Sequence, residues 1–267
     1  MTASTILPLA ALAAMLPASI LAWRRPAAAD LLFWLLLGVA FAGSALVIGV
    51  RIPGGWSPGL GEALWATIAT VLLIFALLLW RAPVAARLGA LLFPYLLIMA
   101  VAALLIGRSG AETSAAGAAV AWLDLHIVVS LATYALVTLA AVAGLAVLLQ
   151  ERALKRRAPT ALSRRLPSVA DGERLELQLM AIAAFVLGIG LLTGMATAWL
   201  EIGRAFLFDH KTIFAVSAFF VILLLLWLRR SNGLRGRRAA RIALLAYLLL
   251  TVAYLGVKVV TQLMLGR

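Results

Sequence analysis

The chain alternates between long apolar runs and short polar segments. Eight runs approach the roughly 20 residues that a helix needs to cross a bilayer, and they lie near residues 4–22, 31–50, 61–80, 88–106, 122–149, 176–200, 211–228 and 240–263. None of the runs alternates between apolar and polar residues as a strand would, so helices are the spanning structure. The pattern predicts an all-α polytopic membrane protein with about eight transmembrane helices.

The composition agrees with this pattern. The chain is 65% hydrophobic and 12% charged, whereas a soluble domain has about half apolar and about a quarter charged residues. We expect one integral membrane domain with two four-helix halves, residues 1–120 and 121–267. The first run has no Lys or Arg before Arg24, so it is expected to be an uncleaved first span.

The distribution of charge predicts the topology. One set of loops holds seventeen Lys and Arg residues, and the alternate set holds five. Basic loops stay in the cytoplasm, so both termini are expected outside. The net charge of +13 is explained by these loops, and nucleic-acid binding is not expected. The longest basic connection, 151–174, is expected to lie along anionic headgroups, and docking of a cytoplasmic partner is the alternative.

The chain has two histidines and no cysteine. The absence of cysteine excludes a disulfide, a thiolate metal site, an iron–sulfur cluster and covalent haem attachment through cysteine. A metal or haem bound to this chain must therefore be held by histidine or by weaker ligands.

His126 stands near the start of the fifth run, at the head of a polar stripe. Ser130, Thr133 and Tyr134 follow at steps of four, seven and eight, which place all of these side chains on one helix face. His210 opens the seventh run, and the topology puts both histidines at the outer face. They could share a cavity and ligate one metal, or they could be interfacial residues without a ligand. Asp124 and Asp209 are expected to be helix N-caps rather than ligands.

Other polar groups are weaker candidates. Lys258 lies inside the last run and could snorkel to the surface or pair with an anion. Arg204 and Lys211, in an outer loop, are further anion-binding candidates. The stretch GIGLLTGMATA (188–198), in which Thr193 and Thr197 stand one turn apart, is typical of small-residue helix packing, and a functional site there is the alternative.

Two segments resemble a known family. LDLHIVVSLATYALVTLAAVAGLAVLLQE (123–151) resembles the start of the cytochrome c assembly domain of the CcsA and CcmC haem-handling proteins, in which a histidine precedes a Ser-x-x-x-Tyr pattern. The elements DHK, GLRGRR and AYLGVK within 208–260 resemble the second half of that domain. The nearest resemblance is to the small YpjD-like branch of bacterial inner-membrane proteins. It covers roughly the last 145 residues.

One motif differs from the larger family. In place of the tryptophan-rich outer segment WGxxWxWDPKE, this chain has FLFDHKT, and His210 stands where that motif has its proline. His126 matches the family histidine directly, whereas His210 belongs to the shorter pattern alone.

The resemblance implies a bacterial inner-membrane protein that binds or relays b-type haem near the outer face. His126 would be an axial ligand of the haem iron and His210 the candidate second ligand, with Lys258 and Arg204 as partners of the haem propionates. The implied partners are the lipid bilayer, haem and cytochrome-assembly or transporter proteins, and no enzymatic activity is expected. Two alternatives stand: a transporter of haem or another small solute, and a non-catalytic membrane partner without haem ligation.

Overall fold

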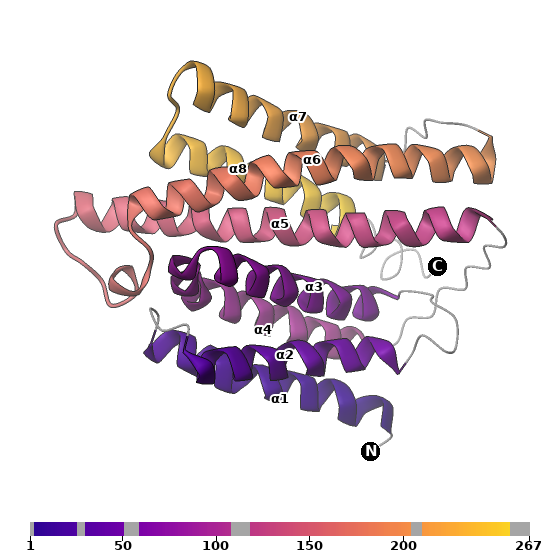
Figure 1. Ribbon diagram of the computed structural model, residues 1–267, viewed down its shortest axis with the longest axis horizontal. Coiled ribbons are helices and arrows are strands. Elements are labelled where there is room, and N and C mark those ends of the chain that lie inside the picture. Colours follow the sequence, from indigo (N-terminus) through magenta and orange to yellow (C-terminus); the bar gives the residue numbers. More distant parts are fainter. Residues whose placement is uncertain (1–2, 26–29, 51–58, 108–117, 204–209, 257–267) are drawn as a thin grey trace. The chain divides into compact units, whose positions relative to one another are not determined.

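A computed structural model describes residues 3–25, 30–50, 59–107, 118–203 and 210–256 (Figure 1). Within these ranges the chain forms α-helices, short 3-10 and π-helical segments, and no strand. The helices are α1 (Ala3–Arg24), α2 (Leu31–Gly49), α3 (Leu60–Arg81), η2 (Pro83–Leu88), α4 (Gly89–Ile106), α5 (Ala118–Lys155), η3 (Ser163–Arg165), α6 (Val169–Ile202), α7 (His210–Ser231), α8 (Gly236–Thr251) and η4 (Val252–Gly256).

Seven of the described helices are long and apolar enough to cross a membrane. The eighth, α8, has 16 residues and continues into the π-helical η4. The expected all-α polytopic architecture is confirmed. The side of the membrane on which each terminus lies stays a prediction.

Helices α5 and α6 are longer than the apolar runs that predicted them. They have 38 and 34 residues, and both extend into the basic connection 151–174. The earlier start of α6 has a local cause, because the Ser168 hydroxyl accepts a hydrogen bond from the Asp171 amide at 3.1 Å and donates to its carboxylate at 2.6 Å. This reciprocal cap begins a helix in a polar segment that hydropathy alone would leave as a loop.

The chain divides into two compact units. Unit 1 comprises Met1–Ala111 and Leu145–Gly172, and unit 2 comprises Glu112–Gly144 and Glu173–Arg267. Helix α5 and the beginning of α6 therefore contribute residues to both. The expected division into halves 1–120 and 121–267 stays a prediction.

The core of unit 1 is built on aromatic rings from three helices. Phe33 of α2 and Phe75 of α3 each meet Phe93 of α4 edge to face, with centroids 6.3 Å apart, and all three are among the fully buried side chains. Asp30 caps the start of α2, because its Oδ1 accepts a hydrogen bond from the Phe33 amide at 3.0 Å.

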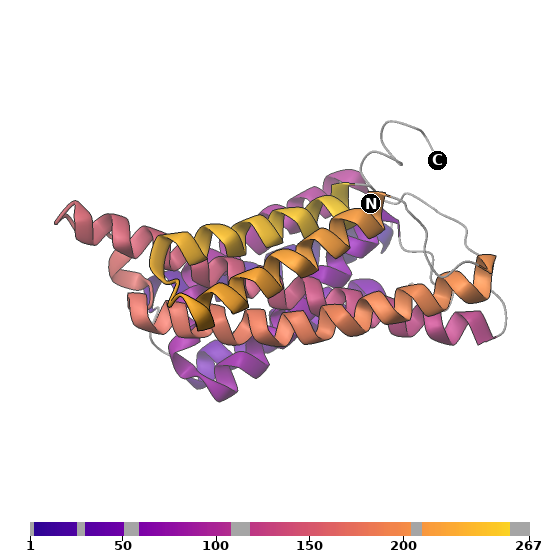
Figure 2. The same ribbon diagram turned by 90° about the horizontal axis from the view of Figure 1, so that it is seen from above.

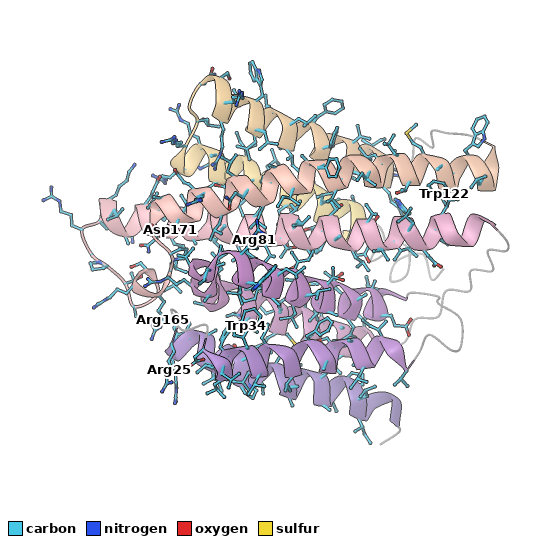
Figure 3. The ribbon with its side chains drawn as sticks, in the orientation of Figure 1. Arg25, Trp34, Arg81, Trp122, Arg165 and Asp171 are labelled. Atoms are coloured by element: carbon cyan, nitrogen blue, oxygen red, sulfur yellow. The ribbon has the colours of Figure 1, made fainter. Side chains whose placement is uncertain are left out.

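The basic connection folds onto unit 1. Gln150 Nε2 donates to the carbonyl oxygens of Ser163 at 2.7 Å and Pro167 at 3.0 Å. Arg165 Nε donates to the carbonyl oxygen of Trp23 at 2.7 Å. These bonds bring basic residues of separate loops to one end of unit 1, where Figure 3 shows Arg25 and Arg165.

A buried ion pair ties the helices of unit 2. Arg229 Nη2 lies 2.5 Å from Glu176 Oε2, and the two side chains are 8% and 0% exposed. Arg229 Nη1 also donates to the Glu173 carbonyl oxygen at 3.2 Å, and the Glu173 carboxylate accepts from the Gly236 amide at 2.5 Å. Helix α6 is thereby joined to the end of α7 and the start of α8.

Breaking the ion pair is expected to destabilise the protein strongly. Glu176→Gln leaves the Arg229 charge buried without a counter-charge, which typically costs about 3–5 kcal/mol of unfolding free energy. The double variant Glu176→Gln/Arg229→Gln should recover much of that loss, because no buried charge remains. Denaturant unfolding in detergent measures both, with the exposed neighbour substitution Arg230→Gln as control. A single variant as stable as the control would contradict the structural role of the pair.

Candidate functional site

The imidazole of His126 lies against helix α6 within unit 2. Its Nδ1 is 3.1 Å from the Gly190 carbonyl oxygen and 3.2 Å from Thr193 Oγ1. A carbonyl oxygen only accepts hydrogen bonds, so a bond between these atoms requires the hydrogen to be on Nδ1. The contact therefore fixes both the tautomer and the orientation of the half-buried ring.

The other ring nitrogen carries the free lone pair. The nearest hydrogen-bonding group to His126 Nε2 is the hydroxyl of Ser130, one turn further along α5, at 3.5 Å. This is a long contact for an O–H donor, which prefers about 2.7–2.8 Å. Nε2 is thus the nitrogen that could bind a metal. No group of three His, Cys, Asp or Glu that could hold a metal ion occurs among the described residues.

Gly194 makes the close approach of the ring possible. A Cβ at Gly194 would lie 3.0 Å from His126 Cε1 and 3.4 Å from its Nδ1, closer than ordinary van der Waals contact. One turn earlier, a Cβ at Gly190 would lie 3.4 Å from Val129 Cγ1. The small residues of α6 therefore form the surface on which the ring rests.

Thr193 completes this surface. Its hydroxyl donates to the Gly190 carbonyl oxygen at 3.0 Å, so Thr193 and His126 share one acceptor. The small residues of GIGLLTGMATA predict helix packing, and the structure adds a second role for them in holding the histidine. The sequence signal for this surface is Gly190 and Gly194, four positions apart, with Thr193 between them. Only the packing of α5 on α6 shows that they face His126.

The polar stripe on α5 serves two neighbouring helices. His126 and Ser130 belong to the side that faces α6, whereas Tyr134 reaches α8. Tyr134 Oη is 3.4 Å from Tyr247 Oη and 3.3 Å from Thr251 Oγ1. Thr133 bonds back to its own helix, at the Val129 carbonyl oxygen. The stripe is thus not a single site.

His210 is the first residue of α7 and is exposed. In Figure 1 and Figure 2, α7 begins at the end of unit 2 where α6 ends and α5 begins. Within the described ranges, His210 forms no hydrogen bond or ion pair with another residue, so nothing joins it to His126. Its role as a second ligand stays a prediction.

Of four further candidate residues, only Asp124 lies within the described ranges. Arg204 and Lys258 lie outside the described residues, as does Asp209. Asp124 lies inside α5, which begins at Ala118, so the expectation that it caps the helix is wrong. The helix begins four residues before the apolar run near 122–149 that predicted it.

Comparison with known proteins identifies relatives of the chain. A family model described as "Cytochrome C assembly protein" matches residues 56–265. The chain is 47% identical over 271 residues to the "Uncharacterized 28.8 kDa protein in nifR3-like 5'region" of Azospirillum brasilense, an alignment that covers 100% of both chains.

Two further relatives match about half of the chain. The inner membrane protein YpjD of Escherichia coli is 29% identical over 140 residues, which are 52% of this chain and 51% of YpjD. The cytochrome c biogenesis protein CcsA of a Synechococcus species is 28% identical over 157 residues, 51% of this chain and 52% of CcsA. No solved structure matches the chain.

The glycine surface yields a direct test. Gly194→Ala is expected to displace the His126 ring, and overpacking of this kind costs about 1–3 kcal/mol. Gly188→Ala is the matched control on the same helix, because its Cβ would meet only Phe219 at 3.6 Å, an ordinary contact. Alanine favours a helix over glycine by about 1 kcal/mol, so the control should be neutral or stabilising. Unfolding in detergent measures both, and equal stability of the two variants would contradict the packing of His126 on Gly194.

Proposed function

The chain belongs to the cytochrome c assembly protein family, and from this membership and the geometry of His126 we propose that it binds haem, with His126 Nε2 as an axial ligand of the iron. Family membership supports a role in cytochrome c maturation, and CcsA, the relative from Synechococcus, is named for cytochrome c biogenesis. The haem that is held would be of the b type, because the chain has no cysteine for covalent attachment.

One observation carries the proposal: His126 Nδ1 donates to the carbonyl oxygen of Gly190. Histidines that ligate metals almost always give their other N–H to a carbonyl or a carboxylate, which fixes the tautomer and raises the basicity of the ligating nitrogen. The acceptor here belongs to the backbone of a long helix, so the ring is held by a rigid element.

The surroundings suit a flat apolar ligand. Trp122, one turn before His126 on α5, is 41% exposed. A side chain four positions before the histidine lies on the same helix face, so Trp122 offers apolar surface for a porphyrin, while the imidazole supplies the ligand atom.

The charge pattern supports a position near the outer face. His126 lies near the beginning of α5, and the basic turn between α7 and α8 lies at the other end of α7 from where α5 begins (Figure 1). Basic loops remain in the cytoplasm, so His126 would face outward. The relative YpjD is named an inner membrane protein, and we place this chain in the bacterial inner membrane on the same reasoning.

The remaining candidates take secondary roles in the proposal. His210 is the candidate second axial ligand, and Arg204 and Lys258 are the candidate partners of the propionates. When bound, haem would supply an iron centre. The chain's own contribution is to orient the imidazole and to surround it with apolar side chains.

Haem titration of the detergent-purified protein tests the ligand assignment. Wild-type protein is expected to develop the Soret band of histidine-ligated haem, and His126→Ala is expected to lose it, because Nε2 is removed. Added imidazole should restore part of the band in His126→Ala by occupying the vacated space. His210→Ala shows whether a second histidine ligates, by conversion from six- to five-coordinate iron. An unchanged band in His126→Ala would refute the proposal.

The supporting hydroxyl gives a finer test. Thr193→Val removes one of the two groups within hydrogen-bonding distance of His126 Nδ1, and loss of such a partner typically costs 10- to 100-fold in metal affinity. Since the Gly190 carbonyl remains, we expect a loss of about 10-fold, near the lower limit. Thr197→Val is the matched control, because that hydroxyl donates only to the Thr193 carbonyl oxygen. Equal haem affinities for the two variants would contradict the role of Thr193.

A further inference from the structure

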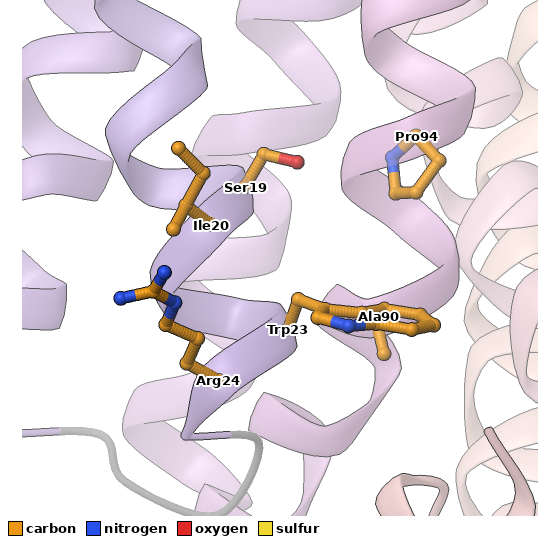
Figure 4. A pocket seen from close by; sticks show the side chains of 6 residues that line it. All are labelled: Ser19, Ile20, Trp23, Arg24, Ala90 and Pro94. Atoms are coloured by element: carbon orange, nitrogen blue, oxygen red, sulfur yellow. The ribbon is translucent and has the colours of Figure 1, made fainter. Parts of the chain in front are cut away.

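We propose that unit 1 carries a specific binding site for one anionic phospholipid, separate from the histidine site. The site is a surface cavity of about 260 Å³ between α1 and α4 (Figure 4), lined by Ser19, Ile20, Trp23, Arg24, Ala90 and Pro94. It lies at the end of α1 where the basic connection folds onto the helix.

The cavity has the lining that an acyl chain requires. Ile20, Ala90 and Pro94 are apolar, and Trp23 extends from α1 toward α4 (Figure 4). Ala90 has a short side chain, which leaves room between the two helices. Tryptophan favours the membrane–water interface. Trp23 is therefore expected to lie where the headgroup of a lipid joins its acyl chains.

Two arginines border the cavity. Arg24 is exposed and forms no ion pair with any residue that the structure describes, whereas the neighbouring Arg25 pairs with Asp30 at 3.9 Å. The guanidinium of Arg165 lies 4.4 Å from the centroid of the Trp23 ring. One cation thus lines the apolar cavity, and a second lies against the tryptophan that borders it.

Arg165 is held in place before any lipid binds. Its Nε donates to the Trp23 carbonyl oxygen at 2.7 Å, and its Nη1 donates to the Ala161 carbonyl oxygen at 2.9 Å. Gln150 holds the connection on either side, at the carbonyl oxygens of Ser163 and Pro167. A preorganised group binds at a lower entropic cost than a flexible one.

The fixed position of Arg165 distinguishes a specific lipid site from general attraction of basic residues to the membrane. A flexible run of Lys and Arg is sufficient for attraction to anionic headgroups, at about 1 kcal/mol for each charge. A fixed arginine over a tryptophan, next to an apolar cavity, instead matches a phosphate joined to an acyl chain. The positive charge selects an anionic lipid such as phosphatidylglycerol over zwitterionic phosphatidylcholine.

Native mass spectrometry of the full chain tests the site, with phosphatidylglycerol and phosphatidylcholine of identical chains offered in equal amounts. Wild-type protein is expected to retain one phosphatidylglycerol in preference. Arg24→Gln should lower that affinity about fivefold, the value of one surface charge. Arg156→Gln, an exposed residue of the same connection, removes equal charge away from the cavity and is the control.

A second variant tests the apolar part without disturbing any described hydrogen bond. Ile20→Trp adds bulk at a side chain that is 54% exposed, and it should reduce retention of both lipids. Equal retention of the two lipids by wild type, or equal losses in Arg24→Gln and Arg156→Gln, would overturn the site. Displacement of the lipid by glycerol phosphate alone would also overturn it, because the ligand would then be a soluble anion.

Discussion

The carbonyl oxygen of Gly190 is the acceptor on which the histidine site depends. Inside a bilayer water is not available, so a polar side chain must find its partners within the protein. The carbonyl of a helix residue is already engaged in its own helix, yet it has a second lone pair. His126 Nδ1 and the Thr193 hydroxyl both approach the oxygen of Gly190. Because Gly194 has no side chain, the imidazole can lie flat enough against α6 to reach it. Because Nδ1 is held by the Gly190 carbonyl oxygen, Nε2 is left available for the proposed ligation of iron.

The same constraint governs the charged groups. In unit 2, the buried Glu176 meets Arg229, and Glu173 caps the start of α8 through the Gly236 amide. In unit 1, Gln150 bonds to carbonyl oxygens of the basic connection, and Arg165 bonds to the Trp23 carbonyl oxygen near the end of α1. These charged groups lie toward the ends of helices, while the middle of unit 1 is formed by residues such as Phe33, Phe75 and Phe93. A haem site that uses a single oriented imidazole adds little polarity to such a scaffold, and the proposed phospholipid site uses charge that the topology already requires.

Hydropathy was sufficient to predict the helical class and most of the helices, because apolar length is the dominant requirement in a bilayer. It was insufficient at α5 and α6, whose ends depend on local caps such as Ser168 with Asp171. His126 was found from the sequence because an ionisable residue in an apolar run is rare. Its partners were not found, because Gly190, Thr193 and Gly194 are typical of helix packing and only the contact between α5 and α6 gives them a further role. The Glu176–Arg229 pair could not be predicted for a similar reason. Its members lie 53 positions apart, and each stands beside a basic connection, where a charged residue is expected to be exposed.

The central claim is that His126 Nε2 binds the haem iron. Hyperfine spectroscopy of the ferric, haem-loaded protein with nitrogen-15 confined to histidine tests it directly, because the chain has only two histidines. The account predicts coupling between the iron and a histidine nitrogen that persists in His210→Ala, where His126 is the one histidine left, and disappears in the double variant His126→Ala/His210→Ala. The absence of histidine coupling in His210→Ala would contradict it.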